Sequence, residues 1–172
     1  MAPTTIAALE GVEPVRSVRT PARLDYRYTP GGASSRFLLG LAGKRILGQR
    51  CPKCRKVYVP PRGACPTDGV PTEEEVELAQ VGTVTSWCVV NVKFYGQAME
   101  VPYVSALVLL DGADLPLMHL IQECPADEVR MGMRVEAVWV PDDELAPTLE
   151  SIRWFRPNGE ADADEAVLRG NV

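Results

Sequence analysis

The spacing of three cysteines in the first half of the chain constrains its fold more than any other feature. Cys51 and Cys54 form one C-x2-C pair, and Cys65 opens a second turn in which Asp68 stands where a fourth cysteine would complete the pattern. Two such turns can present four ligands to one tetrahedral metal ion, and zinc accepts both thiolate and carboxylate ligands. The pattern therefore predicts a compact zinc ribbon over residues 51–70, held by these four side chains.

Other ligand arrangements fit the same sequence. The single histidine, His119, or a distant cysteine could replace Asp68 as the fourth ligand. Water could occupy an open, catalytic position, or the site could lack metal. A lone histidine in an apolar strand is more often a core residue than a ligand. We interpret the zinc as structural, because a loop of about 20 residues cannot bury a core of its own.

The remaining sequence contains five short apolar segments bounded by Gly, Pro or Asp, at 81–92, 101–111, 115–123, 133–141 and 149–155. Segments of this kind are typical of β-strands. Five of them in succession predict a five-stranded, Greek-key OB-type barrel over residues 78–157. The predicted fold class is mainly β, with an N-terminal helix and a rubredoxin-like zinc ribbon preceding the OB-fold barrel.

The segments on either side of these two units have different character. Residues 1–33 are rich in Pro and Gly and predict an extended lead-in or linker. Residues 34–50 predict a helix, because Phe37, Leu38 and Leu41 recur at helical spacing. This helix is expected either to lie on its own domain or to dock onto a partner. Residues 158–172 predict a mobile acidic tail with a short terminal helix.

Charge is distributed unevenly along the chain. Residues 1–69 carry 12 Lys and Arg against 4 Asp and Glu, whereas residues 70–157 carry 5 against 15. This segregation predicts two modules with different electrostatic partners. Nucleic acid is a disfavoured partner for the barrel, because single-strand binders need a positive groove with exposed aromatic side chains.

Cysteine usage and hydropathy limit the compartment. Five cysteines, three of them clustered, fit metal binding in a reducing cytoplasm better than a disulfide framework. Cys88 and Cys124 lie in apolar sequence and are predicted to be buried thiols. No apolar run approaches the ~20 residues that span a bilayer, and no secretory signal peptide is recognisable. These features predict a cytoplasmic protein without a membrane partner.

Catalytic motifs are missing from the sequence. A Ser-His-Asp arrangement could use only His119, and neither G-x-S-x-G nor H-E-x-x-H occurs. The acidic runs 73–75 and 142–144 are typical of solvated faces and not of paired acid–base groups. The chain is therefore predicted not to be catalytic by itself.

The order of these motifs resembles a known family. A basic segment precedes C-x2-C, and "VYVPPR", a second turn beginning "CP", "PYVSALVLLDGA" and "MGMRVEAVW" follow in that order. Over about residues 24–156 this layout resembles the zinc-ribbon/OB-fold family associated with acyl-CoA metabolism and formerly known as a domain of unknown function. The sequence departs from that family at Asp68, where most members have cysteine.

The resemblance implies an accessory role. Family members pair with thiolase-fold proteins, including lipid-transfer-protein-like aldolases that cleave a β-hydroxyacyl-CoA in steroid side-chain degradation. They can also be fused to, or associated with, an enoyl-CoA hydratase. The implied partners of this chain are a thiolase-fold aldolase subunit and a CoA thioester at or near the interface, and the implied cofactor is a structural Zn²⁺.

Under this resemblance, the basic residues around the metal turns have two interpretations. They could contact CoA phosphates or an acidic partner surface, because Lys and Arg clusters favour phosphate oxygens. Alternatively, they only balance the anionic zinc site. The residues are Lys53, Arg55, Lys56 and Arg62. The alternative function is a free-standing acyl-CoA-binding module, in which the barrel mouth holds the acyl chain.

Overall fold

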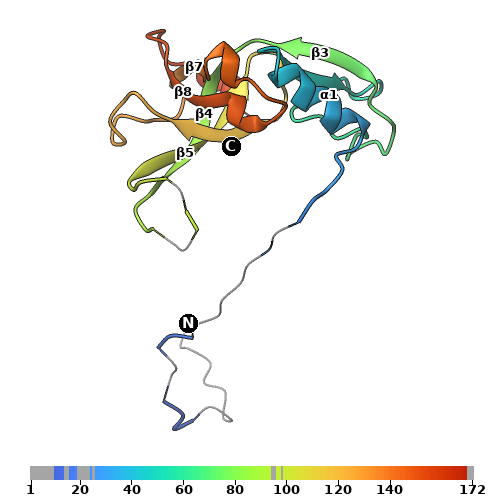
Figure 1. Cartoon of the computed structure of the whole chain (residues 1–172). Helices are drawn as coiled ribbons and strands as arrows, with labels where there is room; N and C mark the ends of the chain where they lie inside the picture. Colours follow the sequence, from blue (N-terminus) through green and yellow to red (C-terminus); the bar gives the residue numbers. More distant parts are fainter. Residues whose placement is uncertain are drawn as a thin grey trace.

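The computed structural model describes residues 10–13, 16–18, 24, 26–93, 96–97 and 99–169. Predictions about the other residues, which include parts of the lead-in and the end of the tail, lie outside the described residues. Figure 1 shows a helix and a small sheet on one side of the molecule and a barrel on the other. Among the described residues, no helix combines the length and apolar content that crossing a bilayer requires.

The first sheet has three antiparallel strands in the order β2-β1-β3. These are β1 (Ile46–Arg50), β2 (Val57–Tyr58) and β3 (Glu74–Leu78). All five residues of β1 pair with β3. The ribbon sheet therefore extends on both sides of the predicted range 51–70.

The helix predicted over 34–50 is wrong in its second half. α1 spans Gly32–Leu41, and residues 46–50 form the strand β1. The backbone turns sharply after Leu41, since Gly40 O accepts N–H groups from both Gly43 and Arg45 at 2.9 Å. A Cβ at Gly40 would lie only 3.0 Å from Arg45 O and from a methyl group of Leu47, so this close approach favours glycine.

Ion pairs tie β3 to the elements on its inner side. Arg50 pairs with Glu74 at 3.0 Å, Arg45 pairs with Glu77 at 2.8 Å, and Arg36 of α1 pairs with Glu75. The acidic run that begins at Glu73 therefore belongs to the same sheet as the basic segment before it. The separation of charge along the sequence is therefore not kept at this boundary, because these arginines and glutamates pair with one another within the ribbon sheet.

The predicted five-stranded barrel is confirmed. Its strands are closed in the order β4-β5-β6-β8-β7, with β6 and β8 pairing in parallel. Short 3₁₀ segments η2 (Asp142–Glu144) and η3 (Leu149–Ser151) connect β7 to β8. The strands are β4 (Val81–Val90), β5 (Tyr103–Leu110), β6 (Leu117–Ile121), β7 (Arg134–Trp139) and β8 (Ile152–Pro157).

One hydrophobic core runs through both halves of the molecule. Phe37 and Leu41 of α1 belong to the same buried cluster as Val84 and Phe155 of the barrel. Both helix residues are almost fully buried, and Leu38 packs against the cluster. The interpretation of Phe37 and Leu41 as contacts for a partner is therefore wrong: α1 packs on its own domain, and Leu39 is its exposed leucine.

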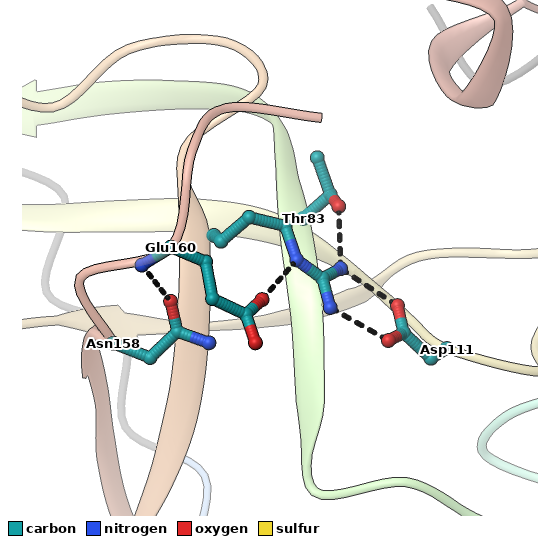
Figure 2. A network of polar contacts seen from close by, with 5 residues as sticks. Thr83, Asp111, Asn158 and Glu160 are labelled. Atoms are coloured by element: carbon teal, nitrogen blue, oxygen red, sulfur yellow. Dashed lines mark hydrogen bonds and ion pairs between the residues drawn. The ribbon is translucent and has the colours of Figure 1, made fainter. Parts of the chain in front are cut away.

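The predicted mobile tail instead lies along the barrel. The Arg134 guanidinium donates to both oxygens of Asp111 at 2.7 Å, to Thr83 Oγ1 at 3.0 Å and to Glu160 Oε2 at 3.0 Å (Figure 2). Arg130 forms a second, bidentate pair with Asp162. The expected terminal helix is α2 (Glu165–Leu168), and its Leu168 is buried. The tail is thus held at two arginines and one apolar contact.

Candidate metal centre

Two turns of the same construction build the metal centre. In the first, Arg55 N donates to Cys51 O at 3.1 Å; in the second, Gly69 N donates to Cys65 O at 2.9 Å. Arg55 and Gly69 occupy equivalent positions, and both have φ of 65°. In each turn a backbone N–H also points at the leading sulfur, at 3.3 Å for Cys51 and 3.4 Å for Cys65. The donor is Lys53 N, two residues after Cys51, in the first turn and Asp68 N, three residues after Cys65, in the second, so backbone N–H groups orient both sulfurs from different positions.

The four predicted ligand residues converge on one point. The Sγ atoms of Cys51, Cys54 and Cys65 and a carboxylate oxygen of Asp68 all lie within 4.8 Å of one another. Asp68 Oδ2 is 3.3 Å from the sulfurs of both Cys51 and Cys65. Cys51 and Cys65 are buried, Asp68 is half-buried and Cys54 is exposed. Three sulfurs and one oxygen in a group of this size fit tetrahedral Zn²⁺.

Hydrogen bonding favours the ionised form of two of these groups. Hydrogen bonds from Cys54, and then from Cys51 and Cys65, hold the pKa of Asp68 below its usual range. Burial opposes ionisation of Cys65, but the Tyr58 hydroxyl and the Asp68 and Thr67 N–H groups lower its pKa overall. Carboxylate and thiolate are the forms that bind zinc. The pKa of Cys54 is instead raised to about 11: a backbone hydrogen bond from Lys56 lowers it, but the hydrogen bond with Asp68 and desolvation together raise it more. Binding of zinc to Cys54 therefore has to displace that proton.

The alternative in which His119 replaces Asp68 as the fourth ligand does not agree with the position of His119. His119 lies on β6 in the barrel, where its ring meets Phe155 edge-on at 5.6 Å between centroids. Its Nδ1 accepts the Leu120 N–H at 2.9 Å, and burial lowers its pKa. These are the contacts of a core histidine, as the sequence indicated.

Tyr58 is a residue of the site that sequence reasoning missed. Its hydroxyl lies 3.2 Å from Cys65 Sγ, and its side chain is only 2% exposed. The hydrogen bond with Cys65 raises the pKa of Tyr58 to about 12, so the hydroxyl keeps its proton and can donate to a thiolate. The sequence signal that could have identified Tyr58 is its place in "VYVPPR", directly after the first metal turn.

The four basic residues near the turns have separate surroundings. All are exposed, as contact with an anion or a partner surface would require. Arg55 pairs with Glu74 at 3.4 Å, and the Arg62 guanidinium lies 5.9 Å from the centre of the Tyr58 ring. Within the described ranges, Lys53 and Lys56 form no ion pair, so these two lysines remain available to an anion.

The metal centre also touches the loop between β5 and β6. Val57 N donates to Asp114 Oδ2 at 2.8 Å, and Asp114 N donates to Val57 O at 3.0 Å. Leu115 packs against the buried group formed by Cys51, Tyr58 and Cys65. The ribbon and the barrel are therefore joined at the metal centre as well as through the shared core.

Family models match both halves of this arrangement. Residues 41–74 match the model described as "ChsH2, rubredoxin-like zinc ribbon domain". Residues 75–140 match "ChsH2, C-terminal OB-fold domain". The zinc ribbon is thereby identified by sequence as well as by its cluster of ligand groups.

Two curated proteins are similar to this chain. A "DUF35 domain-containing scaffold protein" of Methanocaldococcus jannaschii is 38% identical over 96 residues, which are 55% of this chain and 67% of that protein. A "Probable enoyl-CoA hydratase alpha subunit" of Thermomonospora curvata is 34% identical over 114 residues, which are 66% of this chain and 34% of that protein. The chain thus spans about a third of the second relative.

Two solved structures share the fold. The "Ltp2-ChsH2(DUF35) aldolase" contains a chain that is 27% identical, with a TM-score of 0.57, covering 76% of this chain and 98% of that one. A DUF35 protein of unknown function from Sulfolobus solfataricus is 22% identical with a TM-score of 0.54, covering 74% and 84%. The similarity to the aldolase chain extends over nearly the whole of that chain.

Proposed function

The chain belongs to the DUF35 family, and on this premise we propose that it is the accessory subunit of a heteromeric aldolase acting on acyl-CoA substrates. The observation that carries the proposal is the 27% identity to a chain of the Ltp2-ChsH2(DUF35) aldolase over 98% of that chain's length. In the proposed complex a thiolase-fold partner carries the catalytic groups, and this chain stabilises it and helps to shape the CoA-thioester site.

The described residues support a division of labour of this kind. Retro-aldol cleavage needs a base that removes the proton of the β-hydroxyl group and an acid that protonates the departing carbanion. The described part of the chain has one histidine, half-buried with its ring against Phe155, and its glutamate run on β3 is paired with arginines. Four protein ligands complete the coordination of the zinc, so the ion holds the ribbon together.

The exposed lysines of the first metal turn suggest how the ribbon could contribute to the CoA site. Lys53 and Lys56 can bind the phosphates of a CoA thioester as point charges. Reversal of both charges should raise KM for the CoA thioester in the assembled complex, with kcat nearly unchanged, because the lysines bind substrate and transition state alike. Arg169→Glu is the control, since Arg169 is an exposed cation of the tail. An unchanged KM in the double variant contradicts this assignment.

Steroid side-chain substrates are the most specific part of the proposal. They rest on the resemblance of the motif layout around the two metal turns to family members that act in steroid side-chain degradation; the matching ChsH2 models support the family and not the substrate. The similarity to a probable enoyl-CoA hydratase subunit further suggests that such a hydratase is fused to, or associated with, the complex. The substrate test is turnover of steroid and non-steroid β-hydroxyacyl-CoA thioesters by the same purified complex.

Co-expression tests the accessory role directly. The purified chain alone should show no lyase activity, and co-expression with a thiolase-fold subunit from the same host should give a stable heteromer that cleaves β-hydroxyacyl-CoA. Turnover by the chain alone contradicts the proposal, as does a thiolase-fold subunit that is equally stable and active without it.

A second candidate is a free-standing acyl-CoA-binding module. A cavity of about 500 Å³ lies at one end of the barrel, lined by residues that include Tyr103, Ile121 and Cys124. A pocket of this size can hold part of an acyl chain. Calorimetry with CoA thioesters separates the candidates, because tight binding without a partner favours the free-standing module.

A further inference from the structure

The outer half of β4 has one edge without a neighbouring strand. β5 pairs with β4 as far as Val90, whereas β7 pairs with it only from Val81 to Thr83. The last backbone contacts on the β7 side are those of Val84 with Gly132 and Met133. Within the described residues, no strand pairs with this edge beyond Val84. Figure 1 shows the far ends of β4 and β5 projecting from the barrel.

The edge also lacks the features that usually protect an unpaired strand. Natural edges carry charged residues or prolines, which discourage pairing with another chain. Residues 79–92 contain neither, whereas the outer strand of the ribbon sheet, β3, carries three glutamates. Local protection is given by a hydrogen bond from Asn91 Nδ2 to Val89 O at 3.2 Å. The β4 edge therefore lacks the charges that β3 carries.

The side chains of this edge are apolar and accessible. Trp87 is 38% exposed and Val89 is 37% exposed. Because side chains alternate along a strand, these two share one face and Ser86 and Cys88 share the other. Cys88 is exposed, so the prediction that it is a buried thiol is wrong; Cys124 is half-buried. A neighbouring strand would cover both Trp87 and Val89.

We propose that this edge pairs with the same edge of a second copy of the chain, antiparallel about a two-fold axis at Cys88. In this register Cys88 faces Cys88 of the second copy, and Trp87 faces Val89 of the second copy on the other side of the sheet. Pairs of an aromatic and a β-branched residue stabilise antiparallel strands. A two-fold axis places each residue of the edge near the corresponding residues of the second copy, so a charged edge would repel itself. The β4 edge carries no charge, and this repulsion does not arise. The result is a continuous sheet β5-β4-β4-β5 across two molecules.

The occupant is identified by these complementarities. The unpaired backbone requires an extended strand, since every second N–H and C=O of β4 points away from β5. The neutral, alternating sequence of residues 86–90 is itself such a strand. This contact is independent of the proposed aldolase role.

Light scattering of the zinc-loaded, full-length chain over a range of concentrations tests the contact. We expect a dimer, and Val89→Lys should raise its dissociation constant roughly tenfold or more, because two lysines enter the paired edge. Met118→Lys is the matched control: Met118 is 65% exposed on β6, and its variant should remain dimeric. Circular dichroism establishes that both variants are folded.

Cross-linking tests the register. Diamide, which oxidises two thiols to a disulfide, should give a covalent dimer through Cys88 that Cys88→Ser abolishes and Cys124→Ser retains. A wild-type chain that is monomeric at all concentrations overturns the proposal, as does a dimer that Val89→Lys leaves intact. The proposal is also overturned if the chain is monomeric and Val89→Lys abolishes its binding to a different protein. That result would assign the edge to the other protein.

Discussion

The tip of the zinc ribbon and the barrel differ in what fills their interiors. Around the metal turns the buried apolar group consists of Cys51, Tyr58 and Cys65, with Val70 and Leu115 packed against it. The barrel contributes most members of the large cluster, including Val84, Val108 and Phe155, and α1 and β1 pack onto the same cluster. The ribbon base, formed by α1 and β1, is thus stabilised by hydrophobic contact with the barrel. The ribbon tip, formed by the two metal turns, depends on its metal ligands.

The largest expected effect comes from the shared core. Phe155→Ala should lower the free energy of unfolding by about 3–5 kcal/mol, because it removes a fully buried aromatic side chain and leaves a cavity. Chemical denaturation followed by tryptophan fluorescence measures this loss. Since α1 and β1 belong to the same cluster, the ribbon base should unfold in the same transition.

Met118→Ala is the control for this prediction, because Met118 is largely exposed on β6. A separate, unshifted unfolding transition of the ribbon base in Phe155→Ala would show that the two halves do not share a core.

An intermediate effect is expected at the ribbon tip. Tyr58→Phe keeps the ring but removes the hydroxyl that lies 3.2 Å from Cys65 Sγ. Zinc affinity, measured by competition with a chelator, should fall about tenfold, because hydrogen bonds to metal ligands orient them and support their charge. The thiolate-to-metal absorption of the cobalt-substituted protein should shift as well.

Tyr103→Phe removes a hydroxyl from the barrel and is the matched control. Equal zinc affinity and identical cobalt spectra in wild type and Tyr58→Phe would contradict the assigned role of Tyr58, while leaving the four ligands unaffected.

The smallest effect concerns the tail and depends on pH. The hydrogen bond from Arg134, and then that from Asn158, holds the pKa of Glu160 below its usual range. A carboxyl group with a lowered folded-state pKa contributes stability above its unfolded value of about 4.3, and that contribution is lost as pH falls through the folded value. The tail contact should therefore weaken only in acid.

Hydrogen exchange at the Ala163 amide, which donates to Gly132 O at 2.8 Å, reports on this contact. The protection factor of this amide, which corrects for the intrinsic slowing of exchange in acid, should fall below about pH 4 in the wild type, and Glu160→Gln should remove that pH dependence. A variant that retains the wild-type profile would assign the acid sensitivity to a group other than Glu160.

The sequence predicted the barrel and the metal ligands because both leave local patterns. Each barrel strand is a short apolar segment with a turn residue at its end, and the ligands follow a fixed spacing around two turns. β1 and β3 were not predicted, because their signals are not local. The leucines before and within β1 continue a helical spacing, and the glutamates of β3 resemble a solvated run until the opposing arginines are known.

The same reasoning explains the other differences. Tyr58 reaches Cys65 only because β2 pairs with β1, which brings "VYV" back over the second metal turn. The tail is held by Arg134, a residue 26 positions away from Glu160. Exposure of Cys88 results from where β7 ends beside β4. Contacts between distant segments determine each of these features.

The zinc ribbon itself is tested most directly by metal analysis combined with hydrogen exchange. The account predicts one zinc per chain, and on its removal the amides of Cys51 and Cys65, which close the two turns, should lose protection while those of β5 and β6 keep theirs. Asp68→Ala should bind zinc more weakly than the wild type. A chain without zinc, with both turns protected and Asp68→Ala indistinguishable from wild type, would contradict the account.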